Sequence, residues 1–326
     1  MLFKSASVLL FVSSLGLFNV ASATSIEQGV SFLKAGNTEQ AIKQFKKLQG
    51  NPEASLYLAQ IYMQSDLDES QEWIEEAIAQ QPNAAIAHFW RGRIMAAQAQ
   101  NAIFSALSYA GQSLDGFTQA VALEPDSIPY RMGLMQFHLQ APSIAGGDLK
   151  IAQLQVEKIK QLDALAGTKA EIDLAFAQDK ESQAELLLSE AKQNYSHLPD
   201  FFFIAGMRYQ RQENYVKAFE QLSLAANKPA ETEESTRAKY NAMYQLGRTA
   251  VLTENNLALG IQSLQNYLKQ APDLDNMSPK SWAEFRLANL LALNSQQSEA
   301  KLIYLRLSKT ADKNLAKQAK KAARKI

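Results

Sequence analysis

Cysteine is absent from this sequence of 326 residues, and glycine (14), proline (9) and histidine (3) are scarce. Without cysteine, the chain has no disulfide, no thiolate metal site and no lipid attached to a cysteine behind a leader. Glycine and proline are the residues least compatible with helix interiors, so their scarcity favours helical structure. The hydrophobic fraction of 47% excludes a disordered chain. Stability must therefore come from an apolar core, which we expect to be helical.

Signatures of catalysis are also missing. His88, His138 and His197 lie far apart in the chain, and none begins a His-Glu-x-x-His or similar ligand pattern. The sequence has no Gly-x-Ser-x-Gly nucleophile motif and no glycine-rich phosphate loop. Catalysis requires polar groups that converge on one reacting centre. We therefore predict that the protein is not an enzyme and holds neither a metal nor another cofactor.

Long apolar runs are confined to the N-terminus. Lys4 is the only charged residue before Glu27, an apolar stretch covers residues 6–20, and Ala21-Ser22-Ala23 provides small residues for a signal peptidase. This order predicts a cleaved signal peptide of residues 1–23 and a periplasmic protein. An uncleaved membrane anchor is the alternative interpretation. No later run is long enough to span a bilayer, so the mature chain is expected to have no transmembrane segment.

A pattern of small and apolar residues recurs along the rest of the chain. Gly206 is followed by Tyr209 three residues later and by Ala218 after twelve, and then come Leu222 and Ala225. The small residues allow two antiparallel helices to approach closely, while the larger ones fill the seam. The same spacing, once with one inserted residue, returns in four copies: Gly29, Phe32, Ala41, Phe45 and Leu48; Ile172, Ala175, Ala184, Leu188 and Ala191; Gly247, Ala250, Gly260, Leu264 and Tyr267; and Ala288, Leu291, Ala300, Tyr304 and Leu307.

These five copies resemble the tetratricopeptide repeat family, whose period is about 34 residues. The resemblance covers nearly the whole chain after residue 23. It implies an all-α, right-handed superhelical array of antiparallel helix hairpins, with about eight repeats over residues 24–308. A general helical array with irregular pairs is the alternative fold.

Three further repeats are less regular. The one that Ala59 and Tyr62 open has a turn about one residue shorter than the family spacing, and the other two depart further. In the repeat that Gly92 opens, the turn is lengthened by roughly eight residues around positions 100–109, which predicts longer helices. In the next repeat, residues 141–148 replace the turn. There we expect Pro142 to end the first helix, the glycines to permit positive φ, and Asp148 to cap the second helix. The sequence assigns no role to this insertion.

In the tetratricopeptide family, the first helix of each hairpin lines the concave face. Aromatic and arginine side chains on that face would suit a peptide groove, because each provides a large contact area at low entropic cost. Packing between repeats is the other interpretation of the same positions. The candidate partner-binding residues are Phe89, Arg93, Tyr130, His138, Phe203, Met207, Tyr244, Arg248, Trp282, Phe285 and Asn289.

Basic residues cluster at the C-terminus. Residues 309–326 carry seven basic residues and one acidic residue, whereas residues 5–308 have a net charge of −7. An acidic body does not suggest a nucleic-acid partner. Apolar residues at helical spacing from Leu315 to Ile326 predict a terminal capping helix with solvated lysines. Attachment of this segment to an anionic membrane surface is the alternative.

Together these features predict a periplasmic scaffold that binds a protein or peptide partner of the cell envelope in its concave groove, in envelope assembly or maintenance and without a chemical step. The alternative function is a small-molecule or lipid-binding receptor or carrier associated with a transport system. A pocket lined continuously by apolar residues would favour the carrier. An open groove of mixed polarity would favour the scaffold.

The first testable prediction concerns export. Signal peptidase is expected to cleave after Ala23, because Ala21 and Ala23 are the small residues at its recognition positions. Intact-mass analysis of protein from a periplasmic extract should find a chain that begins at Thr24. Recovery of membrane-bound protein that still contains residues 1–23 would contradict the prediction.

Overall fold

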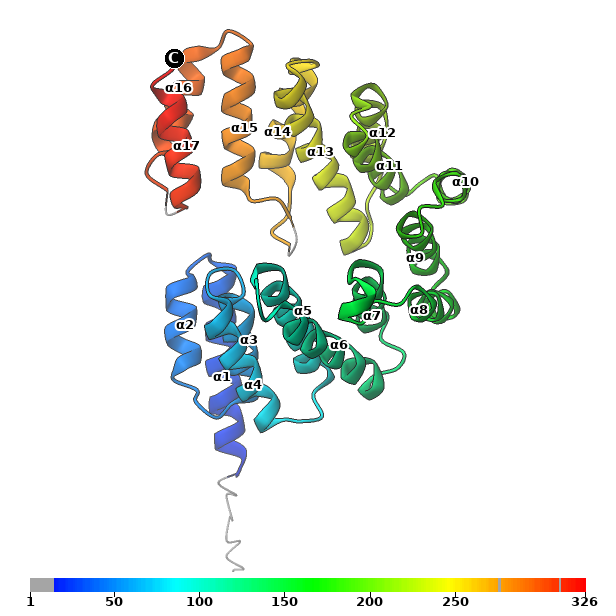
Figure 1. Ribbon diagram of the computed structural model, residues 1–326. Coiled ribbons are helices and arrows are strands. Elements are labelled where there is room, and N and C mark those ends of the chain that lie inside the picture. The colour runs from blue at the N-terminus through cyan, green and yellow to red at the C-terminus, as the bar shows by residue number, and fades with distance from the viewer. Residues whose placement is uncertain (1–14, 275–276, 311) are drawn as a thin grey trace, which may run out of the picture. The chain divides into compact units, whose positions relative to one another are not determined.

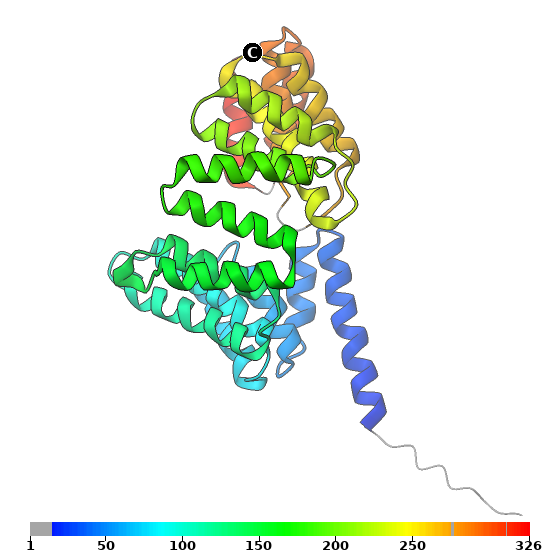
Figure 2. The same ribbon diagram turned by 90° about the vertical axis from the view of Figure 1, so that its right-hand side faces the viewer.

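The computed structural model describes residues 15–274, 277–310 and 312–326, with side chains from Ser25 onward (Figure 1). The described residues form seventeen α-helices and one short 3-10 helix, and no strand occurs among them. The all-α prediction is therefore confirmed. Residues 1–14 of the predicted signal peptide lie outside the described residues. Figure 2 shows the N-terminal part of α1 extending past α2.

The chain divides into two compact units, residues 1–180 and 181–326. The boundary falls at the turn after Asp179, which takes a φ of 55°. The N-terminal unit contains α1 (Leu15–Lys34), α2 (Thr38–Lys46), α3 (Pro52–Tyr62), α4 (Leu67–Gln80), α5 (Ala85–Asn101), α6 (Ala106–Leu123), α7 (Ile128–Gln140), η1 (Ser143–Ala145), α8 (Leu149–Leu162) and α9 (Ala164–Ala177). The C-terminal unit contains α10 (Glu181–Asn194), α11 (Asp200–Arg211), α12 (Tyr215–Asn227), α13 (Glu233–Thr253), α14 (Leu257–Gln270), α15 (Lys280–Leu293), α16 (Gln297–Leu307) and α17 (Lys313–Ala323).

Within each unit, helices pack in chain order. Successive helices contact one another, as α5, α6, α7 and α8 do in the first unit and α13 to α17 do in the second (Figure 1). First helices of neighbouring hairpins also touch: α5 contacts α7 and α7 contacts α9, while α11 contacts α13 and α13 contacts α15. This double set of contacts is what a helical repeat array requires, since each hairpin buries its apolar face only against its neighbours.

The repeat signature forms the seams of hairpins within each unit, where four of its five copies lie, while the copy from Ile172 to Ala191 is divided between the two units. Of the five copies identified in the sequence, only Phe32, Leu48 and Tyr209 are half-buried, and every other member is buried. Close approach explains the glycines: a Cβ atom built on Gly247 of α13 would lie 2.3 Å from the Leu264 side chain of α14. Any larger residue at Gly247 would therefore push the two helices apart.

The last helix, α17, covers the end of the C-terminal unit. Asp312 begins it by accepting a hydrogen bond from the backbone N–H of Leu315 at 2.9 Å. Leu315, Ala319 and Ala323 are buried in the same core cluster as α13 to α16. The basic side chains of this helix and its end are all exposed: Lys317, Lys320, Lys321, Arg324 and Lys325. None of the described helices is long and apolar enough to cross a bilayer.

The second prediction tests whether α17 is a structural cap. Leu315→Ala should lower the free energy of unfolding by about 2 kcal/mol or more, because it leaves a cavity at a side chain that is 0% exposed. Urea-induced unfolding measures the change, and Lys320→Ala, at an exposed position, should stay within about 0.5 kcal/mol of the unsubstituted protein.

Deletion of residues 312–326 should likewise destabilise the protein while leaving its sedimentation with anionic vesicles unchanged. A stable truncated chain that no longer sediments with such vesicles would instead support membrane attachment.

Candidate functional site

An apolar pocket opens in the N-terminal unit between α5, α6, α7 and η1. Its volume is about 460 Å³, within the range of ~300–1,000 Å³ that is usual for small-molecule pockets. Twelve of its sixteen lining residues are apolar or glycine, and the four polar ones are Arg93, Gln100, Gln136 and Gln140. No carboxylate lines it. The pocket is therefore suited to an apolar group rather than to an ion.

Both irregular repeats contribute to this pocket. The lengthened turn of the third hairpin is confirmed as longer helices, since α5 has 17 residues and α6 has 18. The added turns supply Gln100 at the end of α5 and Leu107 at the start of α6. The insertion after α7 supplies Pro142 and Ala145. Departures from the repeat, rather than the repeat itself, thus build one side of the pocket.

The insertion has a well-defined geometry. Helix α7 ends at Gln140, Gly146 takes a φ of 95°, and Asp148 caps α8 by accepting from the backbone N–H of Lys150 at 2.8 Å. A Cβ atom on Gly147 would lie 1.8 Å from the carbonyl oxygen of Ala141, so only glycine fits there. The predicted helix end and cap are therefore present. The segment folds back tightly on the end of α7.

His138 holds the insertion in place. Its Nδ1 atom lies 3.1 Å from the Gly146 carbonyl oxygen, which accepts a hydrogen bond when that nitrogen carries the proton. Burial lowers the pKa of His138 below its ordinary value of 6.5, although the Gly146 carbonyl and Asp148 act in the opposite direction. The side chain is 4% exposed. At neutral pH, His138 is therefore uncharged, and it is buried against the insertion and not accessible to a partner.

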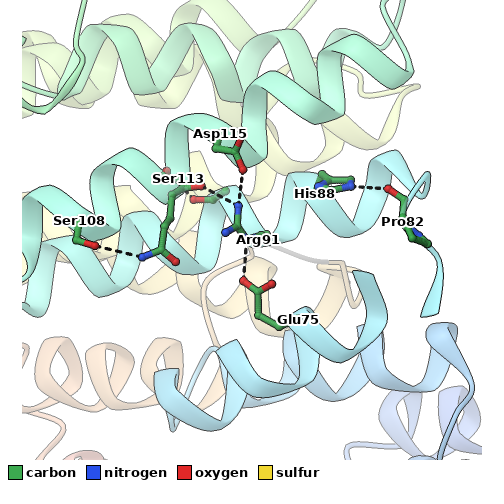
Figure 3. Close-up of polar contacts among 9 residues, drawn as sticks. Glu75, Pro82, His88, Arg91, Ser108, Ser113 and Asp115 are labelled. Atoms are coloured by element: carbon green, nitrogen blue, oxygen red, sulfur yellow. Dashed lines mark hydrogen bonds and ion pairs between the residues drawn. The ribbon is translucent and has the colours of Figure 1, made fainter. Parts of the chain in front are cut away.

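A polar network joins α5 to the helices on either side of it in the chain (Figure 3). The Arg91 guanidinium pairs with Glu75 of α4 and with Asp115 of α6, each at 2.7 Å. The hydroxyl of Ser113 donates to the Gly92 carbonyl at 2.7 Å. These contacts join α4, α5 and α6, so the two helices that wall the pocket are held in register with the preceding hairpin.

The structure separates the predicted partner-binding residues of this unit into two groups. Phe89 and Arg93 line the pocket, with the guanidinium of Arg93 4.1 Å from the Trp90 ring centroid. Tyr130 is buried behind Phe89, with their rings 5.0 Å apart, and His138 is buried against the insertion. Only the first two therefore face open space.

The sequence interpretation missed the pocket residues of α6 and the insertion. Leu107 and Ala145 lie in segments that the repeat spacing identifies as irregular turns, and Ala110 directly follows the first of them. One signal was available, because no charged residue occurs between Arg93 and Asp115. A stretch of 21 uncharged residues around a turn is unusual, since turns are normally solvated.

In the C-terminal unit, the predicted residues lie on three successive first helices. The Nε–H of Arg286 on α15 donates to the hydroxyl of Tyr244 on α13 at 2.8 Å. Arg248 lies one turn beyond Tyr244, and Trp282 lies one turn before Arg286, so they flank this contact. Arg248 is exposed and Trp282 is half-buried.

The remaining candidates in this unit divide in a similar way. Phe203 and Met207 on α11 are half-buried, whereas Tyr244 and Phe285 are buried within the core. Asn289 accepts a hydrogen bond from the Tyr304 hydroxyl at 2.7 Å and so joins α15 to α16. Burial also raises the pKa of Tyr304 to about 12, as expected for a core phenol. The open candidates are therefore Phe203, Met207, Arg248 and Trp282.

Comparison with known proteins locates the fold. No protein-family model matches the chain, and no curated protein matches it. The crystal structure of yeast Tom70 is similar with a TM-score of 0.61 and 18% identity, covering 92% of this chain and 63% of that one. A tetratricopeptide repeat protein from Parabacteroides merdae has a TM-score of 0.49 and 11% identity, and the match covers 82% of this chain and 98% of that one. A human IFIT1 dimer with PPP-AAAA has a TM-score of 0.41 and 15% identity, and the match covers 88% of this chain and 54% of that one. The chain thus has a tetratricopeptide-like helical repeat fold and spans about 63% of the Tom70 chain.

The third prediction concerns His138. As the pH falls below 6.5, the unfolded chain takes up a proton on this histidine more readily than the folded chain, so folding loses stability. Histidine NMR titration should give His138 a midpoint below 6.5. Thermal unfolding at pH 7.5 and 5.5 should show a smaller acid-induced loss for His138→Gln than for the unsubstituted protein. Equal losses in both proteins would contradict the assignment.

Proposed function

We propose that this protein is an exported scaffold that binds a protein partner of the cell envelope through the first helices of its C-terminal unit, with no chemical step. The tetratricopeptide-like fold supports a role in protein interaction. Export is supported by the order of features at the N-terminus, which are Lys4, an apolar stretch and Ala21-Ser22-Ala23. The observation that carries the proposal is the mixed polarity of one row of side chains.

This row consists of Phe203, Met207, Arg248 and Trp282, which we call the first-helix row. It combines three half-buried apolar side chains with one exposed cation. Arginine and tryptophan are among the residues most enriched in binding hot spots. Their combination with apolar neighbours suits a protein surface that offers both an apolar contact and an acceptor for the guanidinium.

The supports of the row are fixed before any partner binds. Gln210 on α11 donates to the Thr249 hydroxyl on α13, and Arg286 holds Tyr244. The Trp282 indole N–H donates to Asp312 at 3.0 Å, and its ring meets that of Phe285 edge-on at 5.9 Å. Because most of these side chains are already ordered, association loses less conformational entropy. The row is thus a preorganised surface.

One observation favours the second candidate function, a receptor or carrier for a small apolar molecule. It is the apolar pocket of the N-terminal unit. Its lining contains no carboxylate and only one cationic side chain, so it is poorly suited to binding an ion. The pocket and the first-helix row belong to different units and use different residues. The two candidates can therefore be tested separately.

The fourth prediction tests the scaffold. Mature protein is immobilised, a captured envelope protein is identified and purified, and its affinity is measured by calorimetry. Arg248→Ala and Met207→Ala should each weaken binding about fivefold or more, since loss of a hot-spot contact costs about 1 kcal/mol or more. Lys269→Ala, which removes an exposed cation from the second helix α14, is the matched control and should bind normally. Unchanged affinity in both row variants, with normal melting, would refute the proposed surface.

A further inference from the structure

We propose that the pocket between α5, α6, α7 and η1 binds one unbranched aliphatic chain of an amphiphile, with the polar head group left at the rim formed by the α5–α6 turn and the insertion. This inference rests on the second candidate function, the carrier of a small apolar molecule, and names its class of ligand. It is independent of the scaffold function, which uses a different unit. It rests on the charge, the hydrogen bonding and the shape of the pocket.

Charge is missing from the segments that surround the pocket. Residues 94–114 contain no charged side chain, and neither do residues 139–147. Arg93 is the only charged lining residue, and its guanidinium lies over the Trp90 ring at 4.1 Å. A ligand with charges along its length would lose hydration there without compensation. The part of the ligand that enters the pocket must therefore be uncharged.

Hydrogen-bonding capacity inside the pocket is also limited. The Gln140 side chain donates to Oε1 of Gln136 at 3.0 Å, and the Gln136 side-chain amide donates to the Asp173 carboxylate at 3.1 Å. A peptide main chain brings an N–H and a C=O for every residue, and each needs a partner when it leaves water. An aliphatic chain needs none. The lining therefore discriminates against a peptide backbone and in favour of a hydrocarbon.

The pocket is elongated along α5. Its lining positions on α5 run from Phe89 to Gln100, which corresponds to about 16 Å along the helix axis. We call this elongated apolar space the channel, and Ala96, Ala99 and Ala110 are among the small residues that line it. A single side chain of a partner would occupy only one end, whereas an extended hydrocarbon chain can contact the lining along its whole length.

The rim offers an apolar approach to the channel. Phe104 is 100% exposed, Ile103 is 85% exposed and Ile144 is 79% exposed. They lie within three residues of the lining residues Ala106 and Ala145. Apolar side chains held in water at a pocket mouth are typical of sites that receive an apolar ligand. The absence of lysine and arginine from the rim places no electrostatic demand on the head group.

The test measures binding of defined amphiphiles to the full mature chain. Calorimetry with n-alkanols below their solubility limits should show one site, with affinity rising roughly fourfold for each added methylene until the channel is full. Dodecanol, dodecanoate and a lysophosphatidylcholine with the same chain length vary the head group. Similar affinities for the first two, with much weaker binding of the third, would assign a free amphiphile, and comparable binding of the third would assign a membrane lipid as the source of the chain.

Two variants place the chain in the pocket. Ala96→Leu fills the middle of the channel and should weaken dodecanol binding at least tenfold. Ala79→Leu adds the same atoms at an exposed position on α4 and should change nothing. Both should melt like the unsubstituted protein. Affinity that does not depend on chain length, absence of saturable binding, or equal binding by the two variants would overturn the proposal, as would displacement of dodecanol by an uncharged apolar peptide.

The outcome does not depend on the scaffold proposal. A chain that binds dodecanol normally while Arg248→Ala loses a protein partner would show two separate sites. Conversely, an Ala96→Leu variant that loses dodecanol binding but still binds the partner would show that the partner-binding surface does not need the pocket.

Discussion

Close approach of two antiparallel helices is the constraint on which the rest of this structure depends. A hairpin of short helices cannot bury its apolar face alone, so each must pack tightly within itself and then against its neighbours. The contact of Gly247 with Leu264 shows how closely the backbones lie. Because every repeat uses the same seam, the first helices emerge in a row, and the side chains on their other faces are free to differ.

The functional features arise where the chain departs from that rule. In the N-terminal unit, longer helices α5 and α6 and the insertion after α7 extend past the ordinary end of a hairpin. The extra residues would be exposed to water as a plain loop, yet they carry no charge between Arg93 and Asp115. Folding back over α7, with Gly147 against Ala141 and His138 against Gly146, converts them into the wall of an apolar pocket. The regular seams supply rigidity, and the irregular segments supply the site.

The two units use their first helices differently. On α5 and α7, apolar residues such as Phe89 and Phe137 line a pocket. On α11, α13 and α15, hydrogen bonds such as Arg286 to Tyr244 join neighbouring helices, while Arg248 is exposed and Trp282 is half-buried. An apolar pocket and a row of mixed polarity favour different ligands, which is why we assign a hydrocarbon chain to one and a protein to the other.

The sequence by itself determined the helical class, the hairpin seams, the cap at Asp148 and the apolar face of α17, because spacing along a helix maps directly onto its faces. It could not separate Tyr244 from Arg248, since both lie on the same face of α13, and contacts with Tyr267 and Arg286 on neighbouring helices are what help to bury Tyr244. The same holds for Phe89, which borders the pocket, and Tyr130, which lies behind it. The pocket itself depended on tertiary structure, because its walls come from residues 89 to 145 on three helices and an insertion whose fold-back no local pattern specifies.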